Sequence, residues 1–369
     1  MTAPRTASVL LALALLAPAA SRAQELPTLP EANGAIHAMV SDGAGGWYVG
    51  GDFRRIGGVA RRGLAHLLAD HTVDLWNPGA DGPVFCLATA NGVVYAGGDF
   101  RHAGGQRRER LAALDAVSGF ATPWRPEVDG AVYALAVHRG LVFAGGAFGA
   151  VSGVGRHGVA ALDVASGLPS LWDPDVDGVV RTLAIEDEKA WLGGSFSYVH
   201  GMPRGHLAVV DLDLGAPGLW NPAADGEVTA LVVTKEAVYA GGFFRTIGGL
   251  ERRGLAAIDR ETGFANVWDP AIEGPVLALA VRGGRLYAGG CFTRVAGLPR
   301  AHLAEFDPQA GTMAFWSPES DGAVLALGVQ EGVVFAAGPF TRMSGFVRTG
   351  LVRVDPTTAQ PLLDTIEVR

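Results

Sequence analysis

The segment Asp173-Pro-Asp-Val-Asp-Gly178 carries three carboxylates at alternate positions, a spacing that could bring them around a hard cation such as calcium. A calcium loop of this type also needs a bidentate acid at its twelfth position, where this chain has Ala184. The related segment Asn77-Pro-Gly-Ala-Asp-Gly82 retains only the last aspartate. Asp173, Asp175 and Asp177 are therefore candidate metal ligands in a partial motif, and we expect an ordinary connecting loop and no cofactor.

Five side chains that could bind a ligand follow regularly spaced phenylalanines. Arg54, Arg101 and Arg245 come directly after their phenylalanines, and Tyr198 and His200 occupy the corresponding loop of another unit. If the spacing reflects a ring of similar units, these side chains share one rim, basic on one side and aromatic on another. An asymmetric rim of this kind is what a ligand-binding face on a ring requires.

Motifs for known chemistries lack the context they need. Gly153-Val-Gly-Arg-His-Gly158 matches the dinucleotide-binding pattern, but it joins two expected strands and opens no helix on which a phosphate could sit. The sequence contains no Gly-x-Ser-x-Gly elbow and no His-Glu-x-x-His segment. We therefore expect no catalytic residues.

An internal repeat organises the whole chain. Six tryptophans are spaced 48 residues apart: Trp76, Trp124, Trp172, Trp220, Trp268 and Trp316. Seven phenylalanines are spaced 47 residues apart once and 48 thereafter: Phe53, Phe100, Phe148, Phe196, Phe244, Phe292 and Phe340. A fixed period of this length indicates a series of equivalent supersecondary units.

Each unit has the pattern of four short antiparallel strands. In the third unit, apolar segments at 130–137 and 141–146 flank a tight turn, and segments 158–163 and 168–172 supply the other two strands. Helical spacing is absent, and a parallel β-helix uses far shorter repeats. We predict an all-β fold, a seven-bladed β-propeller with four antiparallel strands per blade. Its blades start near residues 34, 82, 130, 178, 226, 274 and 322.

Recurring residues are assigned structural roles. A Gly-Gly pair ends the second strand of the first six units, which predicts a bulge or a close approach of two backbones. The tryptophans are expected to pack between adjacent blades. One arginine per unit and an acidic residue before most first strands would share a face, which predicts a ring of ion pairs between blades, with a charged binding face as the alternative. The arginines are Arg61, Arg108, Arg156, Arg204, Arg252, Arg300 and Arg348, and the acids are Asp81, Asp129, Asp177, Asp225, Glu273 and Asp321.

The N-terminus has the pattern of an export signal. Arg5 precedes an apolar stretch from Val9 to Ala20, and Ser21-Arg22-Ala23 forms a small-x-small cleavage site. We predict a signal peptide over residues 1–23, cleaved after Ala23, and a single propeller over 24–369. No later segment approaches the roughly 20 apolar residues of a spanning helix. The protein is thus expected to be secreted or periplasmic, without a membrane span.

The seventh unit departs from the repeat. Asp364 takes the place of a seventh tryptophan, and Ala337-Gly338 replaces the Gly-Gly pair. Leu362, Leu363, Ile366 and Val368 could still form an outer strand. We expect this unit to be the least stable, and removal of residues 361–369 to destabilise the ring.

Composition limits the partners. The formal net charge is −8, which argues against nucleic acid or an anionic membrane. Cys86 and Cys291 lie at non-equivalent positions, so we expect two free buried thiols in a monomeric protein.

The repeat resembles known families. The segments Trp76-Asn-Pro-Gly-Ala-Asp-Gly-Pro-Val84 and Val94-Tyr-Ala-Gly-Gly-Asp-Phe100 resemble the delta-60 repeat of exported bacterial propeller proteins of unknown function. The order of Gly-Gly, Leu-Asp and Trp is also similar to a kelch repeat. Both resemblances imply a propeller, and neither implies a reaction.

A further resemblance raises an enzymatic alternative. Ala113-Leu-Asp-Ala-Val-Ser-Gly-Phe-Ala-Thr-Pro-Trp124 resembles the tryptophan-docking motif of quinoprotein dehydrogenases, with one residue too many between Gly and Trp and no Cys-Cys pair in the chain. We therefore expect a non-enzymatic binding or scaffold module for a protein or glycan partner. A quinone- or metal-dependent enzyme is the alternative.

Overall fold

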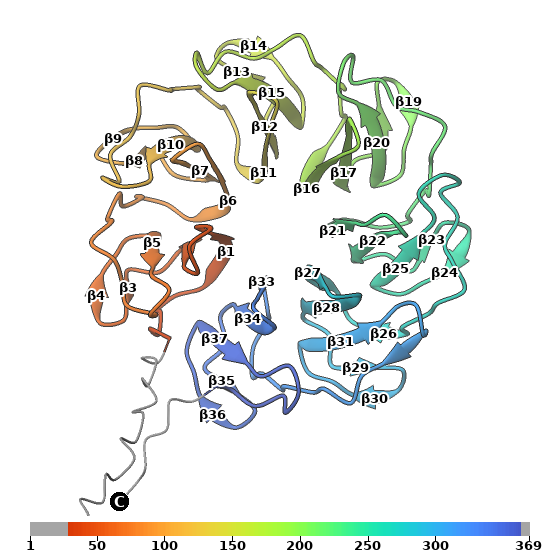
Figure 1. Ribbon diagram of the computed structural model, residues 1–369. Helices are drawn as coiled ribbons and strands as arrows, with labels where there is room; N and C mark the ends of the chain where they lie inside the picture. Colours follow the sequence, from red (N-terminus) through yellow and green to blue (C-terminus); the bar gives the residue numbers. More distant parts are fainter. Residues whose placement is uncertain (1–28, 363–369) are drawn as a thin grey trace, which may run out of the picture.

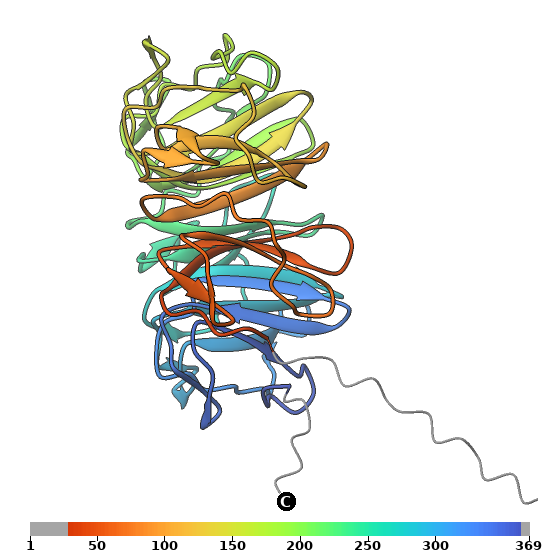
Figure 2. The same cartoon turned by 90° about the vertical axis from the view of Figure 1, so that its left-hand side faces the viewer.

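The computed structural model describes residues 29–362, which form β-strands and connecting loops with no helix in that range (Figure 1). The expected signal peptide and the outer-strand residues Leu363, Ile366 and Val368 lie outside the described residues. Within residues 29–362, seven antiparallel meander sheets follow one another along the chain in a propeller-like arrangement, each accompanied by a smaller sheet built on a short hairpin. Viewed edge-on, the sheets make up a flat disc (Figure 2).

Each sheet is a meander whose first strand is innermost (Figure 1). The innermost strands are β1 (Ile36–Ser41), β6 (Val84–Ala90), β11 (Val132–His138), β16 (Val179–Glu186), β21 (Val228–Val233), β27 (Val276–Arg282) and β33 (Ala326–Gln330). The second strands are β2 (Trp47–Gly51), β7 (Val93–Gly98), β12 (Leu141–Gly146), β17 (Lys189–Ser195), β22 (Val238–Gly242), β28 (Arg285–Gly290) and β34 (Val333–Ala337). The third strands are β5 (Leu64–Leu67), β10 (Leu111–Asp115), β15 (Val159–Asp163), β20 (Leu207–Asp211), β25 (Leu255–Ile258), β31 (Leu303–Asp307) and β37 (Leu351–Val354).

The connection from the second to the third strand folds into a short hairpin, where the sequence predicted only a long loop. These hairpins turn at glycine-containing tips such as Gly57-Gly58 and pair two residues with two. They are β3–β4 (Arg55–Ile56, Val59–Ala60), β8–β9 (His102–Ala103, Gln106–Arg107), β13–β14 (Ala150–Val151, Val154–Gly155), β18–β19 (Tyr198–Val199, Met202–Pro203), β23–β24 (Thr246–Ile247, Leu250–Glu251), β29–β30 (Arg294–Val295, Leu298–Pro299) and β35–β36 (Arg342–Met343, Phe346–Val347). In the sixth sheet β26 (Ile272–Glu273) adds a strand to this hairpin.

The fourth strand of each unit is much shorter than predicted. Among residues 29–362, only the sixth sheet has one, β32 (Thr312–Met313), and the other sheets keep a single bridge such as Leu162 to Pro169. Proline at this position, as also in Pro217 and Pro361, removes the amide that a longer ladder would need. The chain then turns so that the following tryptophan packs inward.

The predicted bulge next to the Gly-Gly pair is confirmed. Opposite Gly145 and Gly146, the register of β11 shifts between Val132 and Ala134, so that Tyr133 is an extra residue. A Cβ on Gly146 would lie 2.2 Å from the Ala131 carbonyl oxygen, and one on Gly145 would lie 2.7 Å from Val180 Cγ1 of the next sheet. Only glycine therefore allows both the bulge and the close approach of the neighbouring sheet.

The tryptophans pack between adjacent sheets, as predicted. Trp172 is 3% exposed, lies 5.1 Å from Phe143 between ring centroids, and donates its Nε1–H to the Asp211 carbonyl of the next unit at 2.8 Å. Trp76, Trp124, Trp220 and Trp316 make the same hydrogen bond to residues 115, 163, 259 and 355, at 2.7 to 3.0 Å. Each bond satisfies a buried donor and links two sheets.

The first and last sheets contact one another. Each innermost strand contacts the next one along the chain, and β33 in turn contacts β1. Trp47 packs on Phe335 with a centroid distance of 5.0 Å, within a buried cluster drawn from residues 29–67 and 326–351. Its ring lies against Gly328, where a Cβ would come within 2.4 Å of it. Trp47 therefore fills, from the first unit, the space left by the missing seventh tryptophan.

Replacing Trp172 tests the link between sheets. Trp172→Ala should lower the free energy of unfolding by about 3–5 kcal/mol through the cavity, and Trp172→Phe by about 0.5–1.5 kcal/mol through the lost hydrogen bond. Leu171, which precedes it and is 97% exposed, provides the control. Urea unfolding of Leu171→Ala should match the wild type, and equal losses for Leu171→Ala and Trp172→Ala would contradict this account.

A double-mutant cycle tests the packing of Trp47 on Gly328. Gly328→Ala should cost roughly 1–3 kcal/mol in the wild type because the new methyl meets the indole. In the Trp47→Val background it should be neutral or stabilising, since Val and Ala at these positions reproduce the pair formed by Val142 of the third sheet and Ala88 of the second. Additive effects in thermal unfolding would show that the two residues do not share this space.

Candidate functional site

One face of the disc gathers the loops that enter each sheet and the loops that follow each recurring phenylalanine. The entry-loop aspartate holds the two together through backbone amides. Asp81 Oδ1 accepts from the Arg101 and His102 amides at 2.7 and 2.9 Å, and Asn33 Oδ1 accepts from the Arg54 and Arg55 amides at 2.8 Å each. Asp129, Asp177, Asp225 and Asp321 form the same clamp.

The predicted ring of ion pairs between these acids and the recurring arginines is wrong. Arg108, which is 3% exposed, donates instead to the carbonyls of Arg107 and Thr122 at 2.7 and 2.6 Å. Arg61, Arg156, Arg204 and Arg252 are also buried and bind the two equivalent carbonyls. The arginine thus links its own hairpin to the segment before the tryptophan, because a guanidinium can satisfy several carbonyls at once.

The five predicted binding residues lie on this face with exposed side chains, in four different units. The amides of Arg101, Tyr198 and Arg245 are bound by the aspartate clamp of their own unit, which fixes where the side chains begin. His200 follows β18 and donates its amide to the Pro174 carbonyl at 2.8 Å. Arg54 and Arg245 border two separate hollows, between sheets one and two and between sheets five and six. The structure therefore spreads the five residues around the face.

The three candidate metal ligands have separate partners. Asp173 Oδ2 lies 3.3 Å from Arg156 Nη1, Asp175 Oδ1 lies 3.2 Å from His157 Nδ1, and Asp177 binds backbone amides. Across residues 29–362, no group of three His, Cys, Asp or Glu side chains is placed to hold a metal ion. Cys86 is buried, whereas Cys291 is exposed, which corrects the prediction of two buried thiols.

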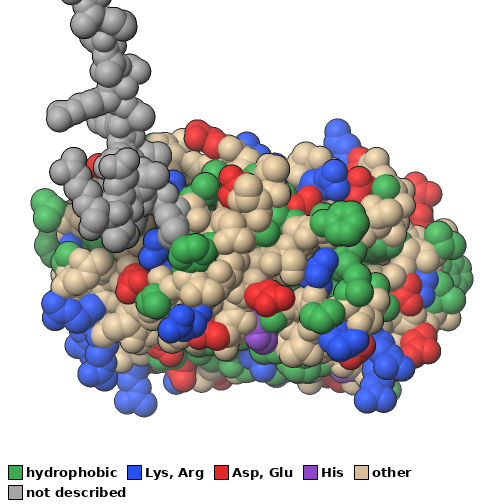
Figure 3. Space-filling view, turned by 90° about the horizontal axis from the view of Figure 1, so that it is seen from below, with side chains coloured by type: hydrophobic (Ala, Val, Ile, Leu, Met, Phe, Trp, Pro, Cys, Tyr) green, Lys and Arg blue, Asp and Glu red, His purple; other side chains and the backbone are tan. Residues whose placement is uncertain are grey.

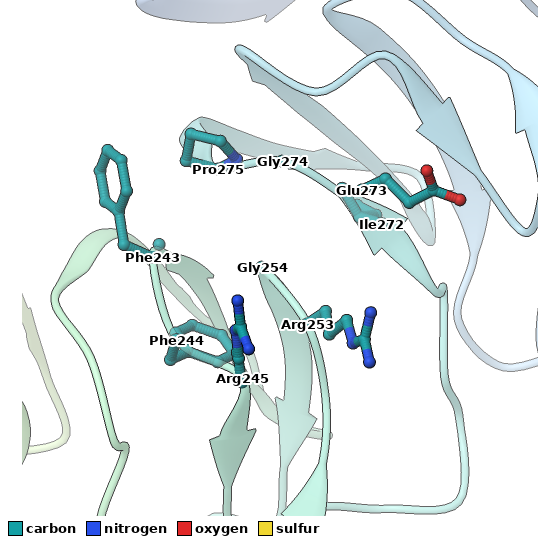
Figure 4. A pocket seen from close by; sticks show the side chains of 10 residues that line it. Phe243, Phe244, Arg245, Arg253, Gly254, Ile272, Glu273, Gly274 and Pro275 are labelled. Atoms are coloured by element: carbon teal, nitrogen blue, oxygen red, sulfur yellow. The ribbon is translucent and has the colours of Figure 1, made fainter.

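A hollow of about 410 Å³ lies between the fifth and sixth sheets on this face (Figure 4). Phe243 projects at its edge and is 55% exposed, and Arg245, Arg253 and Glu273 stand around it. Glu273 belongs to β26 instead of forming the clamp, since β26 pairs with β29 through its backbone. Of the five residues predicted to bind a ligand, Arg245 is the one that lines this recess.

A second recess is the mouth of the central channel, which the sequence analysis missed. All seven innermost strands, or the residues just before them, line a hollow of about 250 Å³ with three consecutive residues each. One equivalent position per unit forms a belt around it, consisting of His37, Phe85, Tyr133, Arg181, Thr229, Leu277 and Leu325. Six of these seven are the extra residues of the bulges. We call these seven residues the channel belt.

Contacts within the channel belt form a continuous arc over the first five sheets. His37 and Phe85 lie 5.5 Å apart between ring centroids, and Phe85 and Tyr133 lie 5.3 Å apart. The guanidinium carbon of Arg181 lies 4.2 Å from the Tyr133 ring centroid, a cation–π geometry. Arg181 Nε also donates to Glu227 Oε1 at 2.8 Å, which adds a partner from the fifth unit.

Electrostatics fix the charge of this arc. Burial opposes the positive charge of Arg181, but the hydrogen bond and charge of Glu227, together with Tyr133, outweigh it and raise the pKa of the guanidinium. Burial lowers the pKa of His37 below 6.5 even though Asp52, with Oδ2 at 3.8 Å from Nε2, favours protonation. The arc therefore holds a fixed cation at Arg181 and a neutral imidazole at His37 at neutral pH.

The sequence contained a signal for the channel belt. When the units are aligned, position 37 and its equivalents change from histidine through aromatic residues and arginine to leucine, within strands that are otherwise small and apolar. The next position but one is leucine in six units and methionine in one. Aligning the seven units and looking for a position whose side-chain chemistry varies, next to a position that hardly varies, would thus have found the site.

On the side seen in Figure 3, acidic, basic and apolar side chains are interspersed over the described residues. Among the described residues, no helix is long and apolar enough to cross a membrane.

Comparisons with known proteins identify the fold alone. No family model and no curated protein matches the chain. The computationally designed protein Ika8 is 18% identical with a TM-score of 0.57, and the match covers 93% of this chain and 90% of Ika8. A chain in a structure of the Mitotic Checkpoint Complex is 13% identical with a TM-score of 0.58, covering 89% and 95%.

A third similar structure is the extracellular domain of the one-component system BT4673 from B. thetaiotaomicron. It is 12% identical with a TM-score of 0.57, and the match covers 89% of this chain and 40% of that chain. At these identities the likeness supports a propeller-like all-β fold and carries no function.

The aspartate clamp should give the fold a measurable pH dependence. Burial would raise the pKa of Asp81, but hydrogen bonds from the His102 ring and from the His102 and Arg101 amides lower it from 3.8 to about 2. Because this pKa is depressed in the folded state, its contribution to stability is complete above pH 3.8 and is lost as pH falls towards 2. Asp81→Asn, which mimics Asn33, should be less stable than the wild type at pH 7 and converge with it near pH 2.

Two further variants complete this test by urea unfolding at pH 2 to 7. Asp81→Ala removes the acceptor and should be destabilised throughout the range. Asp213→Asn, an exposed aspartate outside the clamp, is the control and should show no convergence. A constant gap between Asp81→Asn and the wild type at every pH would contradict the proposed role of the carboxylate charge.

Proposed function

We propose that this chain is an exported, closed seven-bladed β-propeller that binds a protein or glycan partner through the face carrying the aspartate clamps. Contact between β33 and β1 supports closure, as does the hydrogen bond from the Ala32 amide to the Thr349 carbonyl at 3.2 Å. That bond repeats, between the last unit and the first, the one from Ala80 to Arg62 at 2.7 Å. Export rests on the sequence of residues 1–23, and the resemblance to delta-60 and kelch repeats agrees with the architecture.

The observation that carries the binding proposal is the contrast between uniform anchoring and varied side chains on one face. The clamp holds the backbone at Arg54, Arg101, Tyr198 and Arg245 in the same way, while their side chains differ and remain exposed. Structural residues of a repeat are the same in each unit, so variation at rigidly held, exposed positions favours recognition of a partner. Long cationic and aromatic side chains suit the polar surface of a protein or glycan.

A charge-reversal variant tests the face. Arg54→Glu/Arg101→Glu/Arg245→Glu should abolish binding of the purified mature protein on a glycan array and to periplasmic or secreted protein extracts. The matched control Arg139→Glu/Lys189→Glu/Lys235→Glu makes the same charge change at or beside the strand-one-to-strand-two turns, on the opposite face. Binding lost equally in both variants, or kept in both, would reject this face as the binding surface.

The enzymatic alternative has its own readout. Ultraviolet–visible spectra and elemental analysis of the purified wild-type protein would detect a stoichiometric quinone or transition metal. Either result would favour a cofactor-dependent enzyme over a binding module.

A further inference from the structure

The channel belt is chemically uneven. Six of its residues are extra residues of bulges, so they lie outside the backbone ladder between the first two strands. Four belt residues, from His37 to Arg181, are aromatic or cationic, and the other three are Thr229, Leu277 and Leu325. Thr229 Oγ1 donates to the Val276 carbonyl at 2.8 Å, whereas the two leucines are apolar.

The guanidinium group of Arg181 has one edge bound to a carboxylate and one face covered by an aromatic ring. Its Nε binds Glu227, and its planar face lies on Tyr133, so the guanidinium is oriented by two different sheets. The side chain of Arg181 is 34% exposed towards the channel mouth. Its terminal nitrogens supply paired donors in a fixed fork, the geometry that matches a carboxylate.

We propose that the channel belt binds a small carboxylate carried on a single ring. The carboxylate pairs with the terminal nitrogens of Arg181, and the ring lies between the arc formed by Phe85 and Tyr133 and the two leucines across the channel. This site is distinct from the proposed outer binding surface, and it stands whether or not a macromolecule binds there.

The volume of the hollow and the charges around it limit the kinds of ligand that the channel belt can bind. A volume of about 250 Å³ is below the roughly 300–1,000 Å³ of drug-sized sites and accommodates one ring, not an oligosaccharide. Glu227 and Asp52 already place two carboxylates beside the mouth, so a dianion such as inorganic phosphate would be repelled more strongly than a monoanion. A neutral ring compound would leave the fork of Arg181 without an acceptor.

Isothermal titration calorimetry with the mature protein tests the proposal through two matched pairs of probes. Benzoate against benzamide tests an aromatic acid, and glucuronate against glucose tests a sugar acid. In at least one pair the carboxylate should bind ten times or more tightly than its neutral counterpart, and its binding should weaken as salt is added. The pair that shows this preference identifies the ring. Equal binding within both pairs, or no binding of either acid at millimolar concentration, would overturn the proposal.

Variants assign the effect to Arg181. Arg181→Gln should reduce affinity for the preferred acid at least tenfold, with Arg181→Gln/Glu227→Gln giving a similar loss without an unpaired glutamate. Arg282→Gln is the control, because Arg282 ends β27 at the other end of the channel. Leu325→Asp leaves the Arg181–Glu227 pair intact and should also weaken binding of the acid. This variant tests the proposal if the Arg181 variants do not fold. Unchanged affinity in folded Arg181→Gln or Leu325→Asp would show that the belt arginine only ties sheets together.

Discussion

The close approach of neighbouring sheets at their inner ends is the contact on which the rest of the molecule depends. Gly145 allows Val180 of the next sheet to approach to a distance at which any side chain on residue 145 would clash. At the outer end Trp172 hydrogen bonds to the following unit. Each sheet is therefore attached to the next at two separated points, which sets their relative orientation. Repetition of that orientation creates both the central channel and the face with its recesses.

The junction between the last sheet and the first shows that this attachment depends on volume and not on one residue type. The last unit offers no tryptophan at the expected position, and Trp47 of the first unit fills the space against Phe335. Its Nε1–H finds no acceptor among the described residues, unlike that of Trp172. Within residues 29–362 the junction therefore gains apolar contact without the indole-to-carbonyl bond that Trp172 makes. The expectation that the seventh unit is the least stable stays a prediction.

The sequence predicted those features that repetition makes visible. Trp172 and the Gly-Gly pairs recur in register, and a repeated residue must serve a contact that recurs, so their packing roles could be inferred without coordinates. The partners of Arg108 and Asp81 could not be inferred in this way. Both residues recur with opposite charges, so the sequence does not distinguish a pair between them from separate partners for each. Pairing them with each other was the simplest reading, whereas the structure gives each to backbone groups. The short hairpins, which the sequence did not reveal, account for this difference. Arg108 binds a carbonyl of its hairpin, and Asp81 binds amides at the start of that hairpin.

The position of the channel belt in bulges accounts both for its absence from the repeat pattern and for its suitability to carry specificity. A residue opposite a Gly-Gly pair sits in a bulge and lies outside the ladder between the first two strands. It takes no part in the glycine contact or in the tryptophan hydrogen bond that join neighbouring sheets. Tyr133, Arg181 and Thr229 can thus differ on an otherwise regular frame, whereas a change at Val180 would meet glycine backbone. The side-chain type can vary at the bulge because the neighbouring positions, which hold the sheets together, stay the same. A search for residue types that recur in every unit therefore overlooks the bulge position.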